Sequence, residues 1–212
     1  AISHFVHDID PSNLVNGKSI LYLIDGRDEI IGTPLDVGYL ALVNCDNIRV
    51  ENLMLKNNEQ GILLVSTENC WVENCTLENN FWGAYLYSSN NNFVFHNNFV
   101  NNDNQAYDDG SNLWDDGYPS GGNYWGDYTG NDNYRGENQD LQGDDGIGDV
   151  SYVIPGDGDQ DRYPLVDPWP HARVVVSLSI SPSYQDGLPG ENLVYVVALT
   201  NFGNINDNYG LE

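Results

Sequence analysis

The residues best suited to chemistry in this sequence are aspartates in a glycine-rich stretch, GDDGIGDV, which runs from Gly143 to Val150. Ca²⁺ binds six to eight oxygen atoms of carboxylates, backbone carbonyls and amides. Glycines allow the backbone to wrap closely round such an ion. The sequence therefore predicts a calcium site with carboxylate ligands from Asp140, Asp144, Asp145 and Asp149 and a backbone carbonyl ligand from Ile147.

A solvated acidic turn is the alternative interpretation of this stretch. An EF-hand is not implied, because the loop has no glutamate at its twelfth position and no helical pattern on either side. A second acidic group, formed by Asp157, Asp159 and Asp161, follows closely and could share the ion. A bound cation would neutralise carboxylates that otherwise repel each other.

Catalysis on a polysaccharide needs paired acids, or a basic residue with Ca²⁺, on one exposed face. At a step of 22 residues, Arg49 aligns with Trp71 and Glu51 aligns with Glu73. This alignment places no carboxylate pair beside a basic group in a recurrent groove, so we expect that the protein is not an enzyme. Several aromatic side chains could instead stack on sugars, contact another subunit or pack under loops: Trp71, Phe81, Trp82 and Tyr87.

Copper binding is not favoured by the side chains present. Copper sites require a cluster of histidine, cysteine or methionine. The four histidines, His4, His7, His96 and His171, are dispersed along the chain, and Met54 is the one methionine.

The overall charge excludes several classes of partner. The chain of 212 residues has a formal net charge of -25 and only seven lysines and arginines. Nucleic acid and anionic membrane surfaces repel such a chain, whereas divalent cations are attracted. A disordered acidic tail is also excluded, because 40% of the residues are hydrophobic and 12% are aromatic. No apolar run is long enough to span a bilayer, so membrane insertion is not expected.

Elements that could position these groups are indicated by an internal repeat. The glycines at 38, 61 and 83 are spaced 23 and 22 residues apart. Other sets of equivalent residues, which we call columns, recur at a step of 22. They are the asparagine pairs that begin at 57, 79 and 101, the valines at 50, 72 and 94, and the apolar residues at 55, 77 and 99. Several independent columns with one period predict a repeat architecture.

Within each repeat, apolar and polar residues alternate over short runs such as IRVENLMLK and GILLV, which is typical of strands. Leucine-rich repeats share the period, but they need a helical segment and a leucine pattern that this sequence lacks. Asparagine suits the corners, because it tolerates the left-handed backbone region and its amide can bond to the next coil. The prediction is an all-β protein, a right-handed parallel β-helix with coils of about 22 residues.

The alignment at 22 residues also predicts where two of the cysteines lie. Cys45, Cys70 and Cys75 lack the spacing of a metal site, and the last two align with the inward columns of Ile48 and Leu53, as small core residues do. The triplet at 74–76 is a glycosylation signal. Asn74, however, aligns with the corner residue Asn52, which favours a structural asparagine.

Three regions follow from the pattern. Residues 1–102 are predicted to form the coils, and residues 103–170, rich in glycine, aspartate and aromatics, are predicted to cap the last coil. Residues 171–212 contain alternating runs (VVVSLSI and ENLVYVVALTN) that are typical of the first strands of a β-sandwich. A sandwich needs about 100 residues, so either this sandwich is cut off, as in a fragment of a longer surface protein, or its missing strands come from elsewhere, such as a neighbouring copy.

The segments HDIDPSNLVNGKSILYLID, NNEQGILLV, GGNYWGDYTG, DDGIGD and DQDRYPLVDPW together resemble the NosD-like β-helix repeats of archaeal cell-surface proteins, over residues 1–170. These repeats belong to the wider carbohydrate-binding and sugar-hydrolase β-helix superfamily, and some members are copper-maturation accessories. One extra residue precedes DGIGD here compared with the usual family loop. Residues 173–212 resemble the start of the Ig-like domain that often follows in surface-layer proteins, which are secreted and tile or sheathe the cell.

The sequence thus predicts a structural, extracellular cell-surface protein that associates with itself into a surface layer, sheath or filament stabilised by Ca²⁺. The alternative is a glycan-binding, or less favourably a polysaccharide-cleaving, β-helix module of a larger surface protein. Expected partners are further copies of the chain and glycans, and neither nucleic acid nor a membrane interior.

Overall fold

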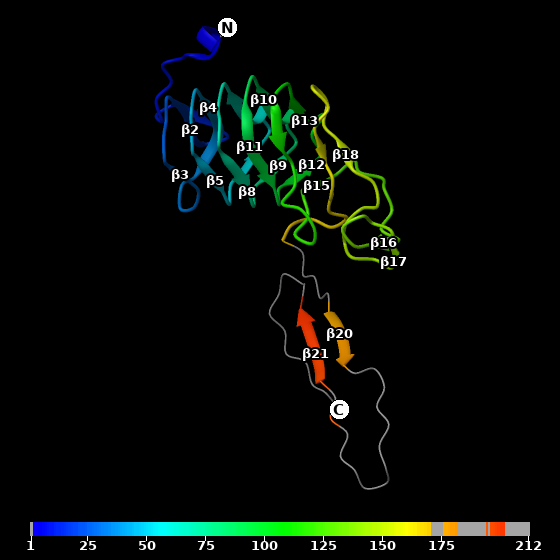
Figure 1. Ribbon diagram of the computed structural model, residues 1–212. Coiled ribbons are helices and arrows are strands. Elements are labelled where there is room, and N and C mark those ends of the chain that lie inside the picture. The colour runs from blue at the N-terminus through cyan, green and yellow to red at the C-terminus, as the bar shows by residue number, and fades with distance from the viewer. Residues whose placement is uncertain (1, 171–175, 182–193, 195, 202–212) are drawn as a thin grey trace, which may run out of the picture. The chain divides into compact units, whose positions relative to one another are not determined.

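A computed structural model describes residues 2–170, 176–181, 194 and 196–201. The chain forms two compact units, Ala1–Pro170 and His171–Glu212. The first unit is a stack of β-coils preceded by the short 3₁₀ helix η1 (Ile2–Phe5), as Figure 1 shows. The predicted all-β parallel β-helix is confirmed, with about five turns of about 22 residues.

Three sheets run along the stack, one for each side of a coil. The first sheet contains β1 (Leu14–Val15), β2 (Lys18–Ile24), β4 (Val37–Val43), β7 (Gln60–Val65), β10 (Trp82–Tyr87) and β13 (Asn104–Asp108). The second contains β3 (Ile30–Ile31), β5 (Arg49–Glu51), β8 (Trp71–Glu73), β11 (Asn90–Phe95) and β14 (Ser111–Leu113). The third contains β6 (Met54–Lys56), β9 (Thr76–Glu78), β12 (Asn98–Val100) and β15 (Tyr124–Trp125). All neighbours are parallel except β1 and β2.

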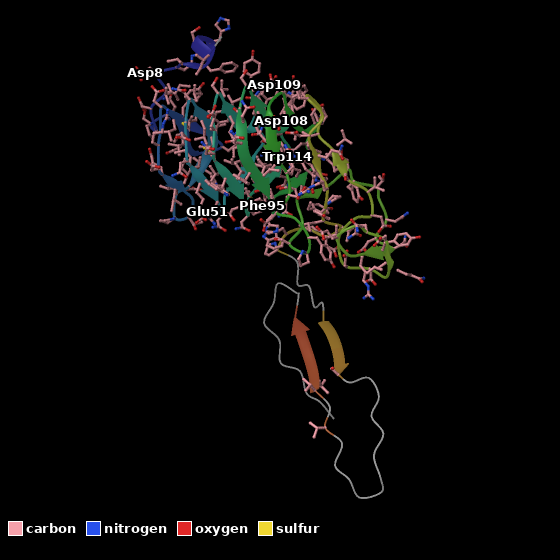
Figure 2. The ribbon with its side chains drawn as sticks, viewed as in Figure 1. Asp8, Glu51, Phe95, Asp108, Asp109 and Trp114 are labelled. Atoms are coloured by element: carbon pink, nitrogen blue, oxygen red, sulfur yellow. The ribbon has the colours of Figure 1, made fainter. Side chains whose placement is uncertain are left out.

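Equivalent apolar residues of successive coils meet in the interior. In the third sheet, Leu55 pairs with Leu77, which pairs with Phe99. All three are fully buried, and each such side chain contributes roughly 1.5–3 kcal/mol by leaving water. Cys70 and Cys75 are also fully buried, as their alignment with the inward columns predicted. The stick view in Figure 2 shows side chains filling the space between the sheets.

Asparagines at the corners serve two separate purposes. The first residue of each Asn pair adopts a positive φ, 56° at Asn57 and 53° at Asn79, which asparagine tolerates better than most residues. The second points inward and bonds along the stack: Asn80 Oδ1 accepts from the Asn58 amide, and Asn102 Oδ1 accepts from the Asn80 amide. Both roles predicted for corner asparagines are confirmed.

The stack continues past residue 102, the predicted end of the coils. Trp82 still pairs with Asn104 at a step of 22, but Phe93 pairs with Leu113 and Phe99 pairs with Trp125. Those two steps are 20 and 26 residues, so the period breaks while the stacking does not. The predicted boundary at 102 therefore lies inside a coil, because loops of different length connect its strands.

The cap is aromatic, as predicted. Trp125 stacks on Phe99 with ring centroids 4.3 Å apart, and Tyr152 stacks on Trp125 at 4.2 Å. Two antiparallel pairs complete the cap: β16 (Tyr134–Arg135) with β17 (Leu141–Gln142), and β18 (Tyr152–Val153) with β19 (Gln160–Asp161).

The second unit contributes one antiparallel pair, β20 (Val176–Ser181) with β21 (Val196–Asn201). Both lie in the two runs that the alternating pattern predicted as strands. The Ig-like sandwich stays a prediction.

Candidate functional site

The predicted calcium loop follows β17, in the part of the cap that Figure 1 shows beyond the last coil. Asp145 is its best-buried carboxylate, with 5% of the residue exposed. Its Oδ1 accepts from the Ile147 amide at 3.1 Å, and its Oδ2 accepts from the Gly136 amide and the Gln139 side chain at 3.3 and 3.1 Å. Asp145 therefore ties the loop to the β16–β17 turn.

Asp149 and Asp132 tie the same loop to the start of β16 and to the residues just before it. Asp149 accepts hydrogen bonds from the backbone amides of Asn133 and Tyr134. Asp132 accepts from the amides of Asp145 and Gly146 at 3.0 and 2.7 Å. Burial raises the pKa of Asp132 despite these hydrogen bonds. Sequence reasoning missed Asp132, although the Asn-Asp-Asn run at 131–133 has the composition of a segment that bonds to nearby backbone.

The other three predicted ligands differ in how far they are buried. Asp140 and Asp144 are exposed. The Ile147 side chain is fully buried with Tyr163 and Leu165. Within the part of the chain that is described, no three His, Cys, Asp or Glu side chains form a group that could hold a metal. Backbone amides thus hold Asp145 and Asp149 against the β16–β17 region, no three of the predicted carboxylates form one group, and the calcium site stays a prediction.

The three aspartates of the second acidic group, Asp157, Asp159 and Asp161, lie in different environments. Asp161 is fully buried in the cap, where its Oδ2 accepts from the Trp125 indole and the Asn123 amide at 2.8 and 2.7 Å. Its Oδ1 accepts from the Tyr163 amide at 3.0 Å. Burial raises the pKa of Asp161 to about 7. Asp159 accepts from the Asn112 amide, whereas Asp157 is exposed.

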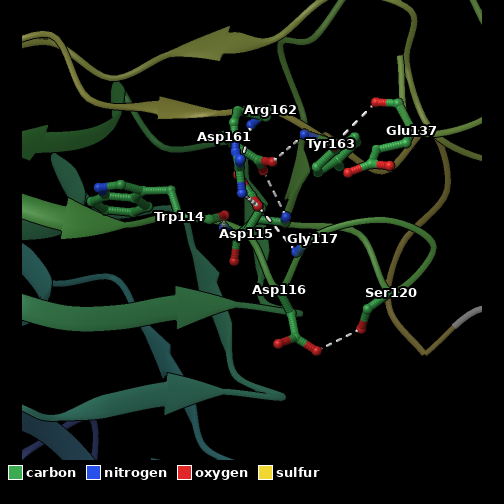
Figure 3. Close-up of polar contacts among 10 residues, drawn as sticks. Trp114, Asp115, Asp116, Gly117, Ser120, Glu137, Asp161, Arg162 and Tyr163 are labelled. Atoms are coloured by element: carbon green, nitrogen blue, oxygen red, sulfur yellow. Dashed lines mark hydrogen bonds and ion pairs between the residues drawn. The ribbon is translucent and has the colours of Figure 1, made fainter. Parts of the chain in front are cut away.

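Two further buried carboxylates were not singled out from the sequence. Asp108 Oδ2 accepts from the Trp114 indole at 2.9 Å, and burial raises the pKa of Asp108. Asp115 pairs with Arg162 through Nη2 and Nε at 2.6 and 3.0 Å, as the close-up in Figure 3 shows. Asp108 is the last residue of β13 and pairs with Leu86 at the regular step of 22, whereas Asp115 lies in the loop between β14 and β15.

A mixed row of side chains crosses the outer face of the second sheet. The pairing places Ile30, Arg49, Trp71, Phe93 and Leu113 in successive coils. Trp71 and Phe93 stack with ring centroids 5.0 Å apart and an interplanar angle of 6°. The predicted alignments of Arg49 with Trp71 and of Glu51 with Glu73 are both confirmed.

Arg49 is the charged centre of this face. Its Nε donates to Glu51 Oε2 at 3.0 Å, and its Nη2 lies 2.5 Å from Glu73 Oε1. Burial raises the pKa of Glu73, and the Arg49 charge opposes that shift. The sequence alignment was expected to place no carboxylate pair beside a basic group, and the structure corrects this, because Arg49 joins the carboxylates of Glu51 and Glu73 from two coils. Beside it lies a shallow hollow of about 260 Å³ lined by Asp28, Glu29, Ile30, Asn47, Arg49 and Trp71.

The outer face of the first sheet carries an aromatic patch, which we define as Phe81, Trp82, Tyr85 and Tyr107. Tyr85 and Tyr107 stack at 4.9 Å, and Trp82 meets both rings edge-on at 5.5 and 5.8 Å. Phe81 is 45% exposed.

A neighbouring part of this face is apolar and already covered. Ala41, Val43 and Val65 are fully buried there. Phe5 packs against this group and meets Tyr87 at 5.6 Å. The first sheet therefore has an outer face suited to packing against further chain.

The described histidines and cysteines, which are ligands that copper requires, do not gather into a group of three. Burial raises the pKa of Cys70 to about 11 and that of Cys75 to about 12, which disfavours the thiolate form that binds metal. His96 stacks on Trp169 at 3.7 Å and contacts the Ser120 carbonyl through Nε2. Met54 stands exposed on β6. The described residues do not fit a copper site, and His171 lies outside them.

Trp169 also bears on the predicted glycosylation signal. Its indole donates to Asn74 Oδ1 at 2.6 Å, and Asn74 has the positive φ of a corner residue, 55°. Asn74 is therefore a structural corner residue that fastens the end of the cap, as its column predicted.

Residues 33–130 match the family model described as periplasmic copper-binding protein (NosD). The match covers the coils from before β4 to just beyond β15. No curated protein and no solved structure matches the chain. None of the helices among the described residues is long and apolar enough to cross a membrane. The stacked coils and the family match together support a NosD-like β-helix in this part of the chain.

Proposed function

We propose that the protein is a structural component of the cell surface, which associates with copies of itself into a layer, sheath or filament. The observation that carries this proposal is the aromatic patch on the first sheet. Partly exposed aromatic rings that lie in mutual contact bury much area at low entropic cost when a partner covers them. The partner that we propose is a second copy of the chain.

The patch adjoins a region that shows how such a face is covered. Phe5 packs beside Tyr87, and the Tyr22 hydroxyl donates to the Phe5 carbonyl at 2.6 Å. A neighbouring copy would extend the same type of aromatic contact across the adjoining patch. The family description supports a location outside the cytoplasm, because it names periplasmic proteins. The cell surface and an archaeal source are the finer parts of the proposal.

Charge makes this association dependent on cations. Each copy carries a formal net charge of -25, so copies repel one another at low ionic strength. Calcium would reduce that repulsion and would occupy the acidic cap near Asp140, Asp144, Asp145, Asp149 and the Ile147 carbonyl. The support for calcium is the density of carboxylates in the cap, although backbone amides already engage Asp145 and Asp149.

A non-catalytic role agrees with how the best-placed acids are used. Arg49 holds Glu51 and Glu73, while Asp161 is enclosed by N–H donors of the cap. General acid–base catalysis needs such groups within reach of a substrate. Asp161 is fully buried and so has no such access.

The test is sedimentation of the purified chain over a concentration series, in Ca²⁺, in Mg²⁺ and in EDTA. We expect growing assemblies in Ca²⁺, and a loss of assembly in a variant with Trp82→Ser and Tyr107→Ser. The control is Trp71→Ser, which removes a half-buried tryptophan from a different sheet and should assemble like the parent. A monomer at every concentration in Ca²⁺ would refute the proposal, and equal assembly of the patch variant would refute the patch as the contact.

A further inference from the structure

The hollow beside Trp71 has a geometry that self-association does not explain. One face of the Trp71 indole stacks on Phe93, which belongs to the following coil. The hollow contains Trp71 together with Ile30 and Arg49, which belong to the preceding coils. The hollow therefore lies on the side of Trp71 that faces the preceding coils, away from Phe93.

Arg49 would be expected to cover that face, because it pairs directly with Trp71 in the neighbouring strand. A guanidinium above an indole is a favourable contact. Here Glu51 and Glu73 hold the guanidinium at 3.0 and 2.5 Å instead. Arg49 thus lines the hollow while its guanidinium is held by the two carboxylates.

The polar residues at the edge of the hollow, Asp28, Glu29 and Asn47, favour a ligand rich in hydroxyl groups. Asp28 and Glu29 line the hollow, and Asn47 donates to Asp28 Oδ1 at 2.6 Å. Carboxylates accept hydrogen bonds from hydroxyl groups, and asparagine both donates and accepts. An aromatic face between such polar groups matches a pyranose ring, which has an apolar face of C–H groups and a rim of hydroxyls.

The charge of the rim excludes acidic sugars. The carboxylates of Asp28 and Glu29 line the hollow, and the guanidinium of Arg49, which also lines it, is already paired with Glu51 and Glu73. A uronate or sulfated sugar would meet a net negative field at short range. The volume of about 260 Å³ is below the roughly 300–1,000 Å³ of sites that enclose drug-sized ligands, so one sugar ring is the fitting size.

We propose that this hollow binds one neutral sugar ring of a glycan, with Trp71 as the stacking platform and Asp28, Glu29 and Asn47 as hydrogen-bonding partners. The face is open along the sheet, so a ring within a longer neutral chain can enter as well as a terminal one. The site lies on the second sheet, whereas the aromatic patch lies on the first. Glycan binding is therefore separable from self-association.

The test is saturation-transfer NMR and titration calorimetry of the whole chain with the methyl glycosides of glucose, galactose and mannose, and with glucuronate as the acidic probe. Measurements in EDTA and at low protein concentration keep the outcome independent of assembly. For a single ring we expect a weak Kd, on the order of 1 mM, for at least one neutral glycoside. Trp71→Ala should weaken binding at least about tenfold, a change of about 1.4 kcal/mol.

Two variants keep the test decisive. Ile30→Trp fills the hollow from a position that is 69% exposed, so it should block binding without disturbing the fold. Trp82→Ala removes an aromatic ring from the first sheet and should leave the Kd unchanged. The proposal is overturned if none of the three neutral glycosides binds, if glucuronate binds more tightly than all of them, or if Trp82→Ala weakens binding as much as Trp71→Ala.

Discussion

Replacing Asn80 with alanine removes an amide that joins three coils. Asn80 Oδ1 accepts from the Asn58 amide at 3.0 Å, and its Nδ2 donates to the Leu55 carbonyl and to Asn102 Oδ1 at 3.1 and 3.0 Å. Asn80 is only 2% exposed, so water has little access to the groups that the substitution leaves behind. The loss therefore measures the contribution of one rung of the asparagine ladder.

The magnitude follows from the groups left without that partner. The Asn58 amide and the Leu55 carbonyl each lose a hydrogen bond, and an unsatisfied buried polar group costs about 1–3 kcal/mol. Asn58 is half-buried and can recover part of its loss through water. We expect Asn80→Ala to lower the free energy of unfolding by about 2–5 kcal/mol, a large share of the roughly 5–15 kcal/mol of a typical domain.

The assay is guanidinium unfolding followed by tryptophan fluorescence. All five tryptophans lie between residues 71 and 169, so the signal reports the unfolding of the coil unit alone. The matched control is Asn79→Gly, one residue earlier, where φ is 53° and glycine is readily accommodated. A loss below about 1 kcal/mol for Asn80→Ala, or an equal loss for Asn79→Gly, would refute the ladder argument.

Three other outcomes test the account. Because the folded pKa of Asp161 is about 7, above the ordinary value of an aspartate, the folded cap binds a proton that the unfolded chain releases. Stability should therefore fall by a few kcal/mol as pH rises from about 4 to about 7, and Asp161→Asn should reduce that slope; an identical slope in the variant would contradict it. The Cys45, Cys70 and Cys75 thiols are buried, so iodoacetamide should modify them at pH 8 only after unfolding, as mass spectrometry would show; rapid modification of the native protein would contradict their burial. Calcium should raise the melting temperature and EDTA should reverse the gain, with a smaller gain in a variant that combines Asp140→Asn and Asp144→Asn; identical melting in Ca²⁺ and EDTA would contradict the predicted site.

Much of the fold could be predicted because stacking forces one residue type into one column. The apolar residues at 55, 77 and 99 and the paired asparagines repeat at a constant step, since every coil must place the same groups at the same corner. The last coil escaped prediction for a physical reason. Only its strands must align with the stack, and the loops between them are free to differ in length, so its columns occur at steps of 20 and 26 residues.

The candidate site was less accessible from the sequence. Acidic residues were recognised by type, but type does not show whether a carboxylate faces a cation, water or a backbone amide. Asp145 and Asp149 accept hydrogen bonds from amides contributed by residues 133–147, contacts that depend on how the β16–β17 pair folds back. The Arg49 cluster was equally hidden, because its three members lie in two coils and meet only through the orientations of their side chains.

Electron microscopy of the purified chain in Ca²⁺, at rising concentration, tests the central claim most directly. The account predicts ordered layers or filaments in Ca²⁺ that disperse in EDTA and do not form when Trp82 and Tyr107 are replaced by serine. Dispersed single particles in Ca²⁺ at every concentration would contradict self-association as the function of this β-helix.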